Sequence, residues 1–570
     1  MAFRDKIIKS DEIQDVFSCN RVMAGPGAGK TYWIVRQISY ALKLGVLHAT
    51  DKIACITYTN KAAQNIEERV GDKCNELYVS TIHSFLYAFV IKPYLHLIAD
   101  SENFAIEKLD GHDDEIIIGY KILSEILPSN KRFAIQKFKD YSKLKSYISK
   151  YHWQSNGQDV LLKSVPQNKT PLRVFGKNDV LAYKQYTWKN YGLLHHDDIL
   201  YFAFKLIVKY PQITNILSNQ FPFVFIDEYQ DTNSIQHHIF QCLANAGSYV
   251  TIIGDEAQSI YRFAGSDIKN LSSFKSNSLQ CFRIEDNRRS TPSLVNFFNM
   301  LRPELQQKAI VTEDYGVPTI LIGSPVETYL KAKELSNNEE ITSLSWSNST
   351  ANMLKLKLNA DKSKDMLASL LDTSSNHDRA RFTFYCINAV ENAKLRLMKD
   401  AIVYVCKAFN LDKRDIMDKQ KAFIILLRIL ERDSEYRNSS LMDFYNIING
   451  LREKSLPKLQ KGKDCQLFSN RYLAFAKDVR YNDEESEHLT IHKAKGLEFN
   501  NVILIIEKND EAVNFLMNAD LNAKQDDWRL YYVACSRAKR RLFISIPHLD
   551  DTQKNLLKEK YKESIIIAEN

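Results

Sequence analysis

Short apolar runs that end in polar or acidic residues recur along the chain. The clearest two are FPFVFIDEYQD at 221–231 and YVTIIGDEAQ at 249–258. Four or five consecutive residues rich in Val, Ile and Phe are typical of a strand buried on both faces of a parallel sheet. The same pattern predicts strands within KIACITYTN at 52–60, NVILIIE at 501–507 and RLFISIP at 541–547.

Helical periodicity lies between these strands and in two long intervals with few strand signals. Residues 61–70 and 293–301 are of the first kind, whereas 87–199 contains Lys-rich amphipathic stretches. Residues 361–483 contain AKLRLMKDAIVYVCKAFNL and KAFIILLRILERD, whose apolar residues have helical spacing. Strands that alternate with helices predict an α/β fold with parallel sheets.

The strand segments form two groups, which predict two sheet-based lobes with one helical insertion each. A chain of 570 residues exceeds a single core, since domains average about 150 residues. The expected segments are 1–86 and 200–283 for the first lobe, 87–199 for its insertion, 284–360 and 484–570 for the second lobe, and 361–483 for its reduced insertion.

Composition is that of a soluble globular protein, with 45% hydrophobic and 26% charged residues. The chain lacks an 18-residue apolar window and a signal-peptide core, so we expect a cytoplasmic protein without a membrane partner. Its nine cysteines include no Cys-x-x-Cys pair and are expected to be reduced thiols. A net charge of +8 suits an anionic partner or a slightly basic cytosolic enzyme, so local motifs must decide.

The stretch AGPGAGKT has the pattern of a phosphate-binding loop. Its glycines let the backbone wrap phosphates with N–H groups, Lys30 can balance the β/γ charge, and Thr31 can ligate Mg²⁺. We therefore expect ATP and Mg²⁺ as cofactors. The remaining loop residues expected to hold the nucleotide are Ala24, Gly25, Pro26, Gly27, Ala28 and Gly29.

A second part of an ATP site follows the predicted strand FVFI. Asp227 and Glu228 come directly after it. One carboxylate can join the Mg²⁺ shell while the other polarises the attacking water. An acid pair after a strand is often only a solvated turn, but a phosphate loop upstream favours ATP hydrolysis over binding alone.

Eight motifs occur in a fixed order along the chain. They are AGPGAGKT (24–31), TYTNKAA (57–63), TIHSF (81–85), IDEYQDTN (226–233), GDEAQSIYRFAGS (254–266), NRRS (287–290), TIHKAKGLEF (490–499) and YVACSRAK (532–539). Together they resemble the superfamily 1A DNA helicases of the UvrD, Rep and PcrA type. The resemblance implies two RecA-like P-loop NTPase lobes with ATP in the cleft between them and a helical insertion in each lobe. It also implies ATP-driven stepping along single-stranded DNA, typically 3′ to 5′.

The resemblance assigns roles to residues of the ATP site. It implies that Asp227 and Thr31 hold Mg²⁺, that Glu228 orients the hydrolytic water, and that Lys30 binds the phosphates. Gln258 occupies the position that senses the γ-phosphate.

Two arginines of the second lobe are implied to reach the γ-phosphate only when the cleft closes. They are Arg289 in NRRS and Arg537 in CSRAK. Glu498, in GLEF, is implied to bind the ribose or the γ-phosphate region.

Two positions depart from the family pattern around the adenine base. Relatives have Arg after GKT and Tyr inside NYRS, whereas this chain has Tyr32 and Arg288 at those places. Because a guanidinium and a phenol can each stack on a base, we expect a sandwich with its faces exchanged. The alternative is that Arg288 faces solvent. Gln14 resembles the adenine-reading glutamine.

DNA contacts are implied for seven residues. Tyr261 and Phe263 are candidates for stacking on bases, although Tyr261 can instead belong to the core. Ala264 lacks the guanidinium that many relatives have after the aromatic residue. Residues in motifs that touch the DNA backbone are Thr57, Asn60, Thr81, His83 and His492.

Three functions follow from these patterns. The first is an ATP-dependent DNA helicase or translocase on single-stranded DNA. The second is a DNA-stimulated ATPase sensor that regulates a separate nuclease subunit, since the chain resembles in size and layout the compact helicase of the Gabija anti-phage defence system. With few residues after Arg537, any nuclease would be a separate chain. The third, an ATP-binding scaffold without turnover, disagrees with the intact acids and arginines.

Overall fold

A computed structural model describes most of the chain between residues 5 and 569. The exceptions are 72–74, 110, 113–115, 117, 119, 129–141, 165–174, 263–264, 348–349, 352, 355–366, 368–369, 371–376, 395–396, 413–414, 453, 457–462, 482–485 and 522–526. The chain divides into two compact units. One contains Met1–Ile341 and Ala494–Asn570, and the other contains Thr342–Lys493.

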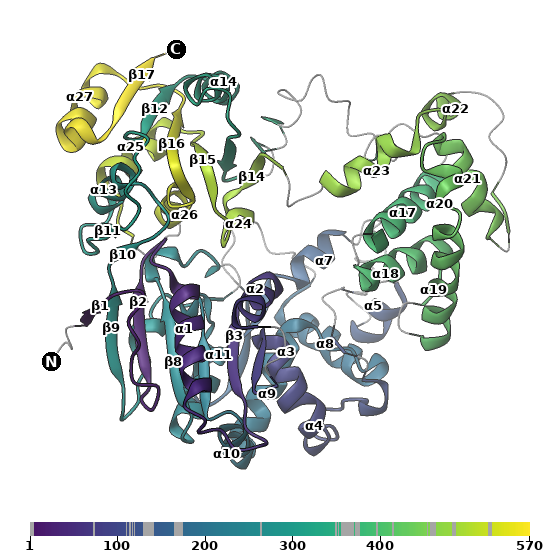
Figure 1. Ribbon diagram of the computed structural model, residues 1–570. Helices are drawn as coiled ribbons and strands as arrows, with labels where there is room; N and C mark the ends of the chain where they lie inside the picture. Colours follow the sequence, from purple (N-terminus) through teal and green to yellow (C-terminus); the bar gives the residue numbers. More distant parts are fainter. Residues whose placement is uncertain are drawn as a thin grey trace. The chain divides into compact units, whose positions relative to one another are not determined.

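The first sheet of the larger unit has seven parallel strands in the order β1-β9-β2-β8-β7-β3-β4 (Figure 1). The predicted parallel sheet and the strands expected in 52–60, 221–231 and 249–258 are confirmed as β3, β7 and β8. The bounds are β1 Lys6–Ile8, β2 Asn20–Ala24, β3 Ile53–Thr57, β4 Leu77–Thr81, β7 Phe223–Ile226, β8 Tyr249–Gly254 and β9 Gln280–Ile284.

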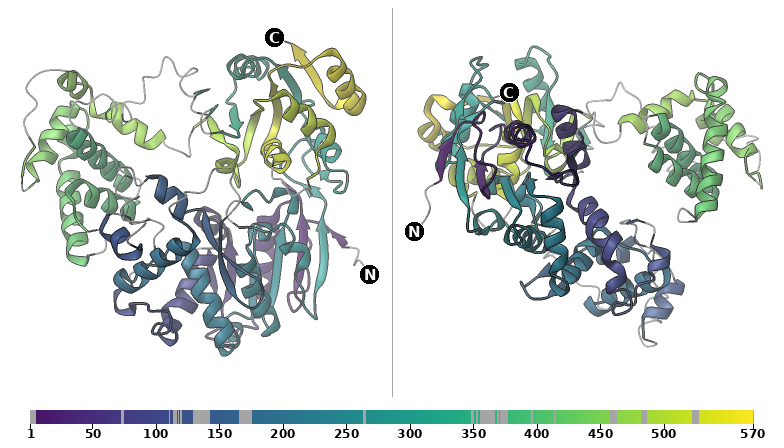
Figure 2. Two further views of the ribbon diagram at one scale, coloured as in Figure 1. Left: turned by 180° about the vertical axis from the view of Figure 1, so that it is seen from behind. Right: turned by 60° about the horizontal axis from the view of Figure 1, so that its bottom comes forward.

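Helices cover both faces of this sheet because its central strands are apolar on both sides. In β3, Ile53 and Cys55 join the core under α1 and α2, whereas Ala54 and Ile56 join the core on the opposite face. Figure 2 turns the molecule so that the teal helices of that opposite face come forward. The helices of this part are α1 Lys30–Lys43, α2 Asn60–Val70, α3 Ile82–Leu86, α4 Lys92–Tyr94, α5 Tyr120–Ile126, α7 Ser142–Ile148, α8 Lys177–Tyr191, α9 His196–Lys209, α10 Gln212–Gln220, α11 Ser234–Asn245 and α12 Asn270–Ser273.

We predicted a helical insertion at 87–199, but this interval is not purely helical. It contains an antiparallel hairpin of β5 (Tyr151–Ser155) and β6 (Val160–Ser164). The turn has Asn156 and Gly157 at its tip, and the Asn156 Oδ1 accepts hydrogen bonds from the next backbone N–H groups at 2.8 and 3.1 Å. An Asn-Gly pair between alternating strands is a strong hairpin signal, and the Lys-rich helical periodicity around it obscured that signal.

The second sheet of the larger unit lies in the segments that follow the first sheet. Its strands run parallel in the order β15-β16-β12-β17, and β15 and β16 confirm the strands predicted at 501–507 and 541–547. A short parallel pair, β10 and β11, precedes it. The bounds are β10 Asp286–Asn287, β11 Lys308–Ala309, β12 Thr319–Ile322, β15 Phe499–Ile505, β16 Ala538–Ile546, β17 Ile566–Glu569, α13 Pro292–Leu301, α14 Pro325–Leu335, α25 Asn509–Asn518, α26 Asp527–Cys535 and α27 Asp551–Tyr561.

In its described residues, the smaller unit is helical apart from one parallel pair of strands near its ends. Apolar residues of α17, α21 and α23 form its main core. The helical periodicity predicted within 361–483 is confirmed by α18 and α19, whose apolar residues share a second core. Its elements are β13 Thr342–Ser345, α17 His377–Lys394, α18 Met398–Phe409, α19 Ile416–Leu430, α20 Asp433–Tyr436, α21 Leu441–Gly450, α22 Lys463–Phe468, α23 Tyr472–Tyr481, β14 His488–Thr490 and α24 Ile491–Ala494, the last ending just beyond it.

Two further sequence expectations concern cysteines and membranes. The eight cysteines within the described ranges are free thiols, five of them buried. In the same ranges, no helix combines the length and the apolar character needed to cross a lipid bilayer.

A fully buried carboxylate fixes the insertion against α9. Asp198 accepts hydrogen bonds from the indoles of Trp153 (2.9 Å) and Trp188 (3.0 Å), from the Lys184 Nζ (2.6 Å) and from the His195 N–H (3.2 Å). Burial alone would raise the pKa of Asp198, but Lys184 and His195 hold it below its usual range. One side chain therefore ties the hairpin and α8 to the helix that packs on the first sheet.

Replacing Asp198 with asparagine should lower the free energy of unfolding by about 3 to 5 kcal/mol, because it leaves the Lys184 ammonium buried without its counter-charge. Urea denaturation followed by tryptophan fluorescence measures this loss, since Trp153 and Trp188 both contact Asp198. The matched control is Asp197→Asn. Asp197 is a partly exposed neighbouring acid that accepts the backbone N–H of Trp153 at 2.8 Å. Equal losses in the two variants would contradict the special role of Asp198.

Candidate nucleotide and DNA site

The phosphate loop connects the carboxyl end of β2 to the first turn of α1. Gly27 and Gly29 adopt left-handed φ angles of 71° and 80°, which glycine reaches without steric cost. The Gly29 carbonyl accepts the Trp33 N–H at 2.8 Å, so the helix begins directly at Lys30. Backbone N–H groups at a helix start form a ready site for a phosphate.

The predicted acid pair lies beside Lys30. Its Nζ is 3.9 Å from the Glu228 Oε1 and 3.5 Å from the Ala24 carbonyl. The Asp227 N–H donates to the Ile56 carbonyl at 2.9 Å, which fixes the end of β7 against β3. Glu228 has a φ of 51°, an unusual value for a residue other than glycine. Backbone strain of this kind often occurs at functional sites.

The two acids have opposite pKa shifts. Burial and the neighbouring Glu228 carboxylate raise the pKa of Asp227 to about 7. Burial would also raise the pKa of Glu228, but Lys30, Lys495 and the Gln230 amide lower it to about 2. Glu228 is therefore the ionised acid, and the raised pKa of Asp227 reflects first its burial and then the neighbouring Glu228 carboxylate.

A buried carboxylate beside a phosphate loop fits a divalent cation. Mg²⁺ prefers oxygen ligands and usually joins one or two protein carboxylates with phosphate oxygens and water. Asp227 supplies a buried carboxylate, and the Thr31 hydroxyl follows Lys30 in the first turn of α1. These donors fit the predicted Mg²⁺ site, in which the metal would neutralise phosphate charge.

Arg537, which directly precedes β16 of the second sheet, contacts Gln258, which follows β8 of the first sheet. The Arg537 Nη2 donates to the Gln258 Oε1 at 2.9 Å, and the Gln258 Nε2 donates to Asp255 at 2.7 Å. Arg537 follows α26 and is only 3% exposed. Burial and the nearby Arg289 guanidinium lower the pKa of Arg537 to about 9, and this charge environment favours an anion.

Arg289 and Glu498 form a second pair near Arg537. The Arg289 Nε and Nη2 lie 2.9 and 2.8 Å from the Glu498 Oε1, and the Lys539 Nζ lies 3.0 Å from the Oε2. Burial opposes the ionisation of Glu498, but Arg289 and Lys539 lower its pKa to about 2. The structure therefore brings five of the six predicted catalytic residues into contact pairs: Lys30 with Glu228, Gln258 with Arg537, and Asp227 beside Glu228. Arg289 joins them through its electrostatic effect on Arg537.

The two residues that depart from the family pattern lie against each other. The Arg288 Cζ is 5.0 Å from the centroid of the Tyr32 ring, and the Arg288 Nε donates to the Ser10 Oγ at 2.5 Å. Gln14 is four residues after Ser10 in the sequence. Its backbone N–H donates to the Oε1 of Gln37 in α1 at 3.1 Å. A base between Arg288 and Tyr32 would need about 7 Å, two contact layers of about 3.5 Å, so the pair would have to separate on binding.

Replacing Arg288 with alanine should weaken ATP binding about tenfold and change the ratio of ATP to GTP affinity, because stacking on a base is worth about 1 to 3 kcal/mol. Fluorescence titration with labelled ATP and GTP measures both. Arg36→Ala is the control, since the Arg36 Cζ also lies near the Tyr32 ring, at 5.8 Å, but belongs to α1. An unchanged ATP to GTP ratio in Arg288→Ala would mean that this residue does not stack on the base.

Four of the predicted DNA contacts lie at the carboxyl edge of the first sheet. Thr57 is buried at the end of β3 and donates to the Thr59 carbonyl, and Asn60 is exposed at the start of α2. Thr81 caps α3 by accepting the Ser84 N–H at 3.3 Å, and the His83 ring stacks on His196. Such an edge is where ligands of open α/β sheets bind.

The other three DNA candidates come from later motifs of the chain. Tyr261 stacks on Tyr58 with ring centroids 4.8 Å apart and planes 14° apart. His492 lies in α24, within the smaller unit. Phe263, and Ala264 beside it, lie outside the described residues.

Sequence reasoning missed two residues beside Tyr261. Tyr58 is 40% exposed, and the Lys495 Nζ lies 4.5 Å from the Tyr261 ring and forms an ion pair with Asp231. Both residues stand inside the quoted motifs, in TYTNKAA and TIHKAKGLEF, so an aromatic ring and a cation there were the available signals. The three side chains make a platform on which a base can stack.

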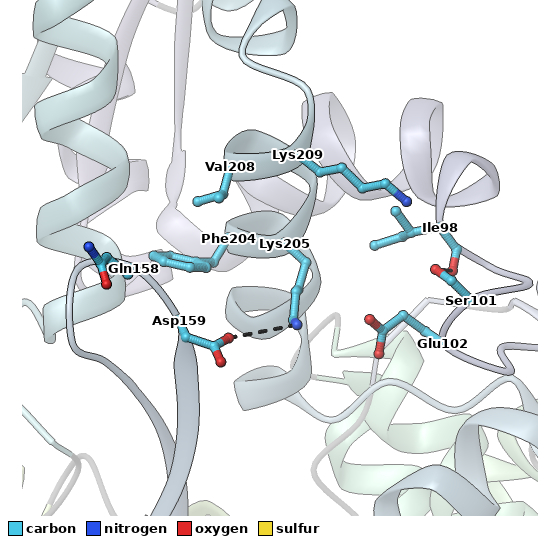
Figure 3. A pocket seen from close by; sticks show the side chains of 9 residues that line it. All are labelled: Ile98, Ser101, Glu102, Gln158, Asp159, Phe204, Lys205, Val208 and Lys209. Atoms are coloured by element: carbon cyan, nitrogen blue, oxygen red, sulfur yellow. Dashed lines mark hydrogen bonds and ion pairs between the residues drawn. The ribbon is translucent and has the colours of Figure 1, made fainter.

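An open cavity of about 320 Å³ lies away from these motifs (Figure 3). Two lysines and two acids are among the residues that line it, and the Lys205 Nζ lies 3.7 Å from the Asp159 Oδ1. Its lining residues are Ile98, Ser101, Glu102, Gln158, Asp159, Phe204, Lys205, Val208 and Lys209. None of them belongs to the predicted nucleotide or DNA residues.

Comparison with known proteins agrees with the motif order. The UvrD/REP helicase N-terminal domain family matches residues 10–278. ATP-dependent DNA helicase Rep of Buchnera aphidicola is 24% identical over 626 residues, covering 92% of this chain and 90% of Rep. The chain is therefore similar to the UvrD/Rep helicases.

Two further relatives match about half of this chain. ATP-dependent DNA helicase PcrA of Staphylococcus epidermidis is 30% identical over 307 residues, covering 52% of this chain and 40% of PcrA. PcrA of Staphylococcus aureus is 29% identical over 291 residues, covering 49% and 37%. In these matches the chain spans less than half the length of PcrA, whereas the Rep match spans nearly all of Rep.

Proposed function

We propose that the chain is an ATP-dependent DNA helicase that couples Mg-ATP hydrolysis to movement along single-stranded DNA in the 3′-to-5′ direction. The names and activities of the relatives Rep and PcrA support this class of function. The observation that carries it is the 2.9 Å hydrogen bond from Arg537 to Gln258. This contact joins an arginine that precedes a strand of the second sheet to a glutamine that follows a strand of the first.

In this proposal the phosphate loop and Lys30 bind the triphosphate, and Thr31 and Asp227 hold Mg²⁺. The Glu228 carboxylate, ionised at neutral pH, orients the attacking water and accepts its proton. Arg289 and Arg537 neutralise charge that develops on the transferred phosphoryl group. Because they come from the segments around the second sheet, hydrolysis would depend on the closed arrangement of the two sheets.

The proposed DNA track follows the carboxyl edge of the first sheet and the platform of Tyr58, Tyr261 and Lys495. Lys495 connects this platform to the ATP site, because its Nζ also donates to the Gln258 carbonyl at 2.9 Å. A base that displaces the Lys495 ammonium from the Tyr261 ring would therefore affect Gln258. The division into two lobes belongs to the same proposal, with one insertion at 87–199, which contains a β-hairpin as well as helices, and a helical one at 361–483.

ATPase assays with and without single-stranded DNA, followed by strand displacement on 3′-tailed and 5′-tailed duplexes, test this function. We expect DNA-stimulated hydrolysis and displacement of 3′-tailed duplexes. Strong stimulation without displacement on either substrate would favour the alternative of an ATPase sensor that acts with a separate nuclease. Absence of hydrolysis in the presence of DNA would contradict both.

A further inference from the structure

The phosphate loop accepts hydrogen bonds from residues of the segment 287–307, which follows the first sheet in the sequence. Two side-chain amides donate to the same carbonyl, that of Pro26: the Asn287 Nδ2 at 3.1 Å and the Gln307 Nε2 at 3.0 Å. The Arg288 N–H donates to the carbonyl of Gly27 at 2.8 Å. The carbonyls of Pro26 and Gly27 thus accept hydrogen bonds from donors in the segment 287–307.

These donors are buried and fixed in place. Asn287 is 1% exposed and Gln307 is 5% exposed. Asn299 of α13 accepts the Gln307 N–H at 2.8 Å and donates to its carbonyl at 2.9 Å. The Asn287 Nδ2 also lies 3.3 Å from the Gln307 Oε1, so the two carboxamides orient each other. A buried polar network with its partners satisfied is rigid.

The same asparagine also holds the backbone of a proposed arginine finger. The Asn287 Oδ1 accepts the N–H groups of Arg289 and Ser290, each at 3.0 Å. One side chain therefore donates to the phosphate loop through its nitrogen and accepts from Arg289 through its oxygen. A shift of the Pro26 carbonyl would be transmitted to Arg289 through a single rigid amide group.

The loop glycines fit this contact closely. A Cβ at Gly25 would lie 2.6 Å from the Leu305 Cδ2 and 2.8 Å from the Gln307 Nε2. A Cβ at Gly27 would lie 2.5 Å from the Asn287 Oδ1. These glycines are therefore required by the approach of Asn287 and Gln307 as well as by any wrapping around phosphate.

We propose that Asn287 and Gln307 form a carboxamide latch that couples the phosphate loop to Arg289. The latch holds the loop in the conformation that binds phosphate and sets the position of Arg289 relative to it. Asn287 and Gln307 are positioning residues, since neither is assigned a contact with the nucleotide. The inference rests on the proposed ATP hydrolysis for its effect on Arg289, but its effect on the loop requires only nucleotide binding.

Gln307→Leu tests the latch, because leucine is similar in size and removes the donor to Pro26. We expect the Kd of a fluorescent, non-hydrolysable ATP analogue to rise about tenfold and single-turnover hydrolysis to slow by a similar factor. The matched control is Gln306→Leu. Gln306 is exposed, and its amide donates to the carbonyl of Pro303 at 2.9 Å rather than to the loop. Its variant should behave like the wild type.

A double-mutant cycle with Arg289→Ala separates the latch from a purely structural role. If Gln307 acts through Arg289, Gln307→Leu slows hydrolysis in the wild-type background but causes little further slowing in Arg289→Ala. Fully additive effects would overturn the coupling, and an unchanged Kd would overturn the hold on the loop. If Gln307→Leu does not fold, Gln307→Met, which keeps the unbranched shape and has no N–H donor in its side chain, takes its place. A wild-type chain without hydrolysis would contradict the proposed function, while the Kd comparison would still test the loop contact.

Discussion

Replacing Glu228 with glutamine should slow ATP hydrolysis by about 10² to 10⁴, the range for loss of a positioned general base. The amide keeps the size of the side chain and its left-handed backbone but cannot accept the proton of the attacking water. Because Lys30 and the loop N–H groups remain, the variant should still bind ATP. Steady-state hydrolysis together with equilibrium titration of labelled ATP measures the two effects separately.

Two control variants accompany Glu228→Gln. Lys30→Ala should lose both turnover and affinity, since Lys30 is expected to contact the phosphates. Glu256→Gln alters an acid in the turn after β8, outside the pair at 227–228, and should retain turnover. Retained hydrolysis in Glu228→Gln would remove this residue from the role of activating water.

Replacing Arg537 with alanine should reduce the rate of hydrolysis by about 10³ to 10⁵, the contribution typical of an arginine finger. The guanidinium is buried, donates to Gln258, and lies near Arg289, so burial and that second positive charge together favour an anion at this point. Arg537→Lys should rescue little, because an ammonium cannot reproduce the planar fork of donors. Single-turnover hydrolysis at saturating ATP isolates the effect on the chemical step.

The matched control for Arg537 is Arg540→Ala. Arg540 is three residues further along the chain, and its Cζ lies 5.2 Å from the Tyr315 ring. We expect near wild-type hydrolysis from this control. Similar losses in both variants would indicate a general effect of removing basic residues, and not a finger at position 537.

The central strands could be predicted from the sequence because both of their faces are buried. The pattern FVFI in β7 has four consecutive buried apolar residues. The edge strand β1 has the burial pattern exposed, exposed, buried, and β9 alternates between partly and fully buried residues, so neither gives a continuous apolar run. A strand at the edge or next to it is recognised from the strand it pairs with, and a local pattern does not contain that information.

The same limit applies to the site. Lys30, Asp227 and Glu228 could be assigned because each follows a strand or a glycine loop in the sequence itself. The contact of Asn287 and Gln307 with Pro26 could not, since it depends on how segments more than 250 positions apart pack. Likewise, NRRS named Arg288 and Arg289 as candidates, but the carboxamide that positions Arg289 has no chemical signature in a local motif.

Translocation on single-stranded DNA tests the central claim most directly. Chains preloaded on oligonucleotides of increasing length, labelled at the 5′ end, are mixed with Mg-ATP and a trap for released protein. The account predicts a fluorescence lag that grows linearly with length for the 5′ label and is absent for a 3′ label. A lag independent of length, with ATP hydrolysis intact, would contradict the proposal that this ATP moves the chain along DNA.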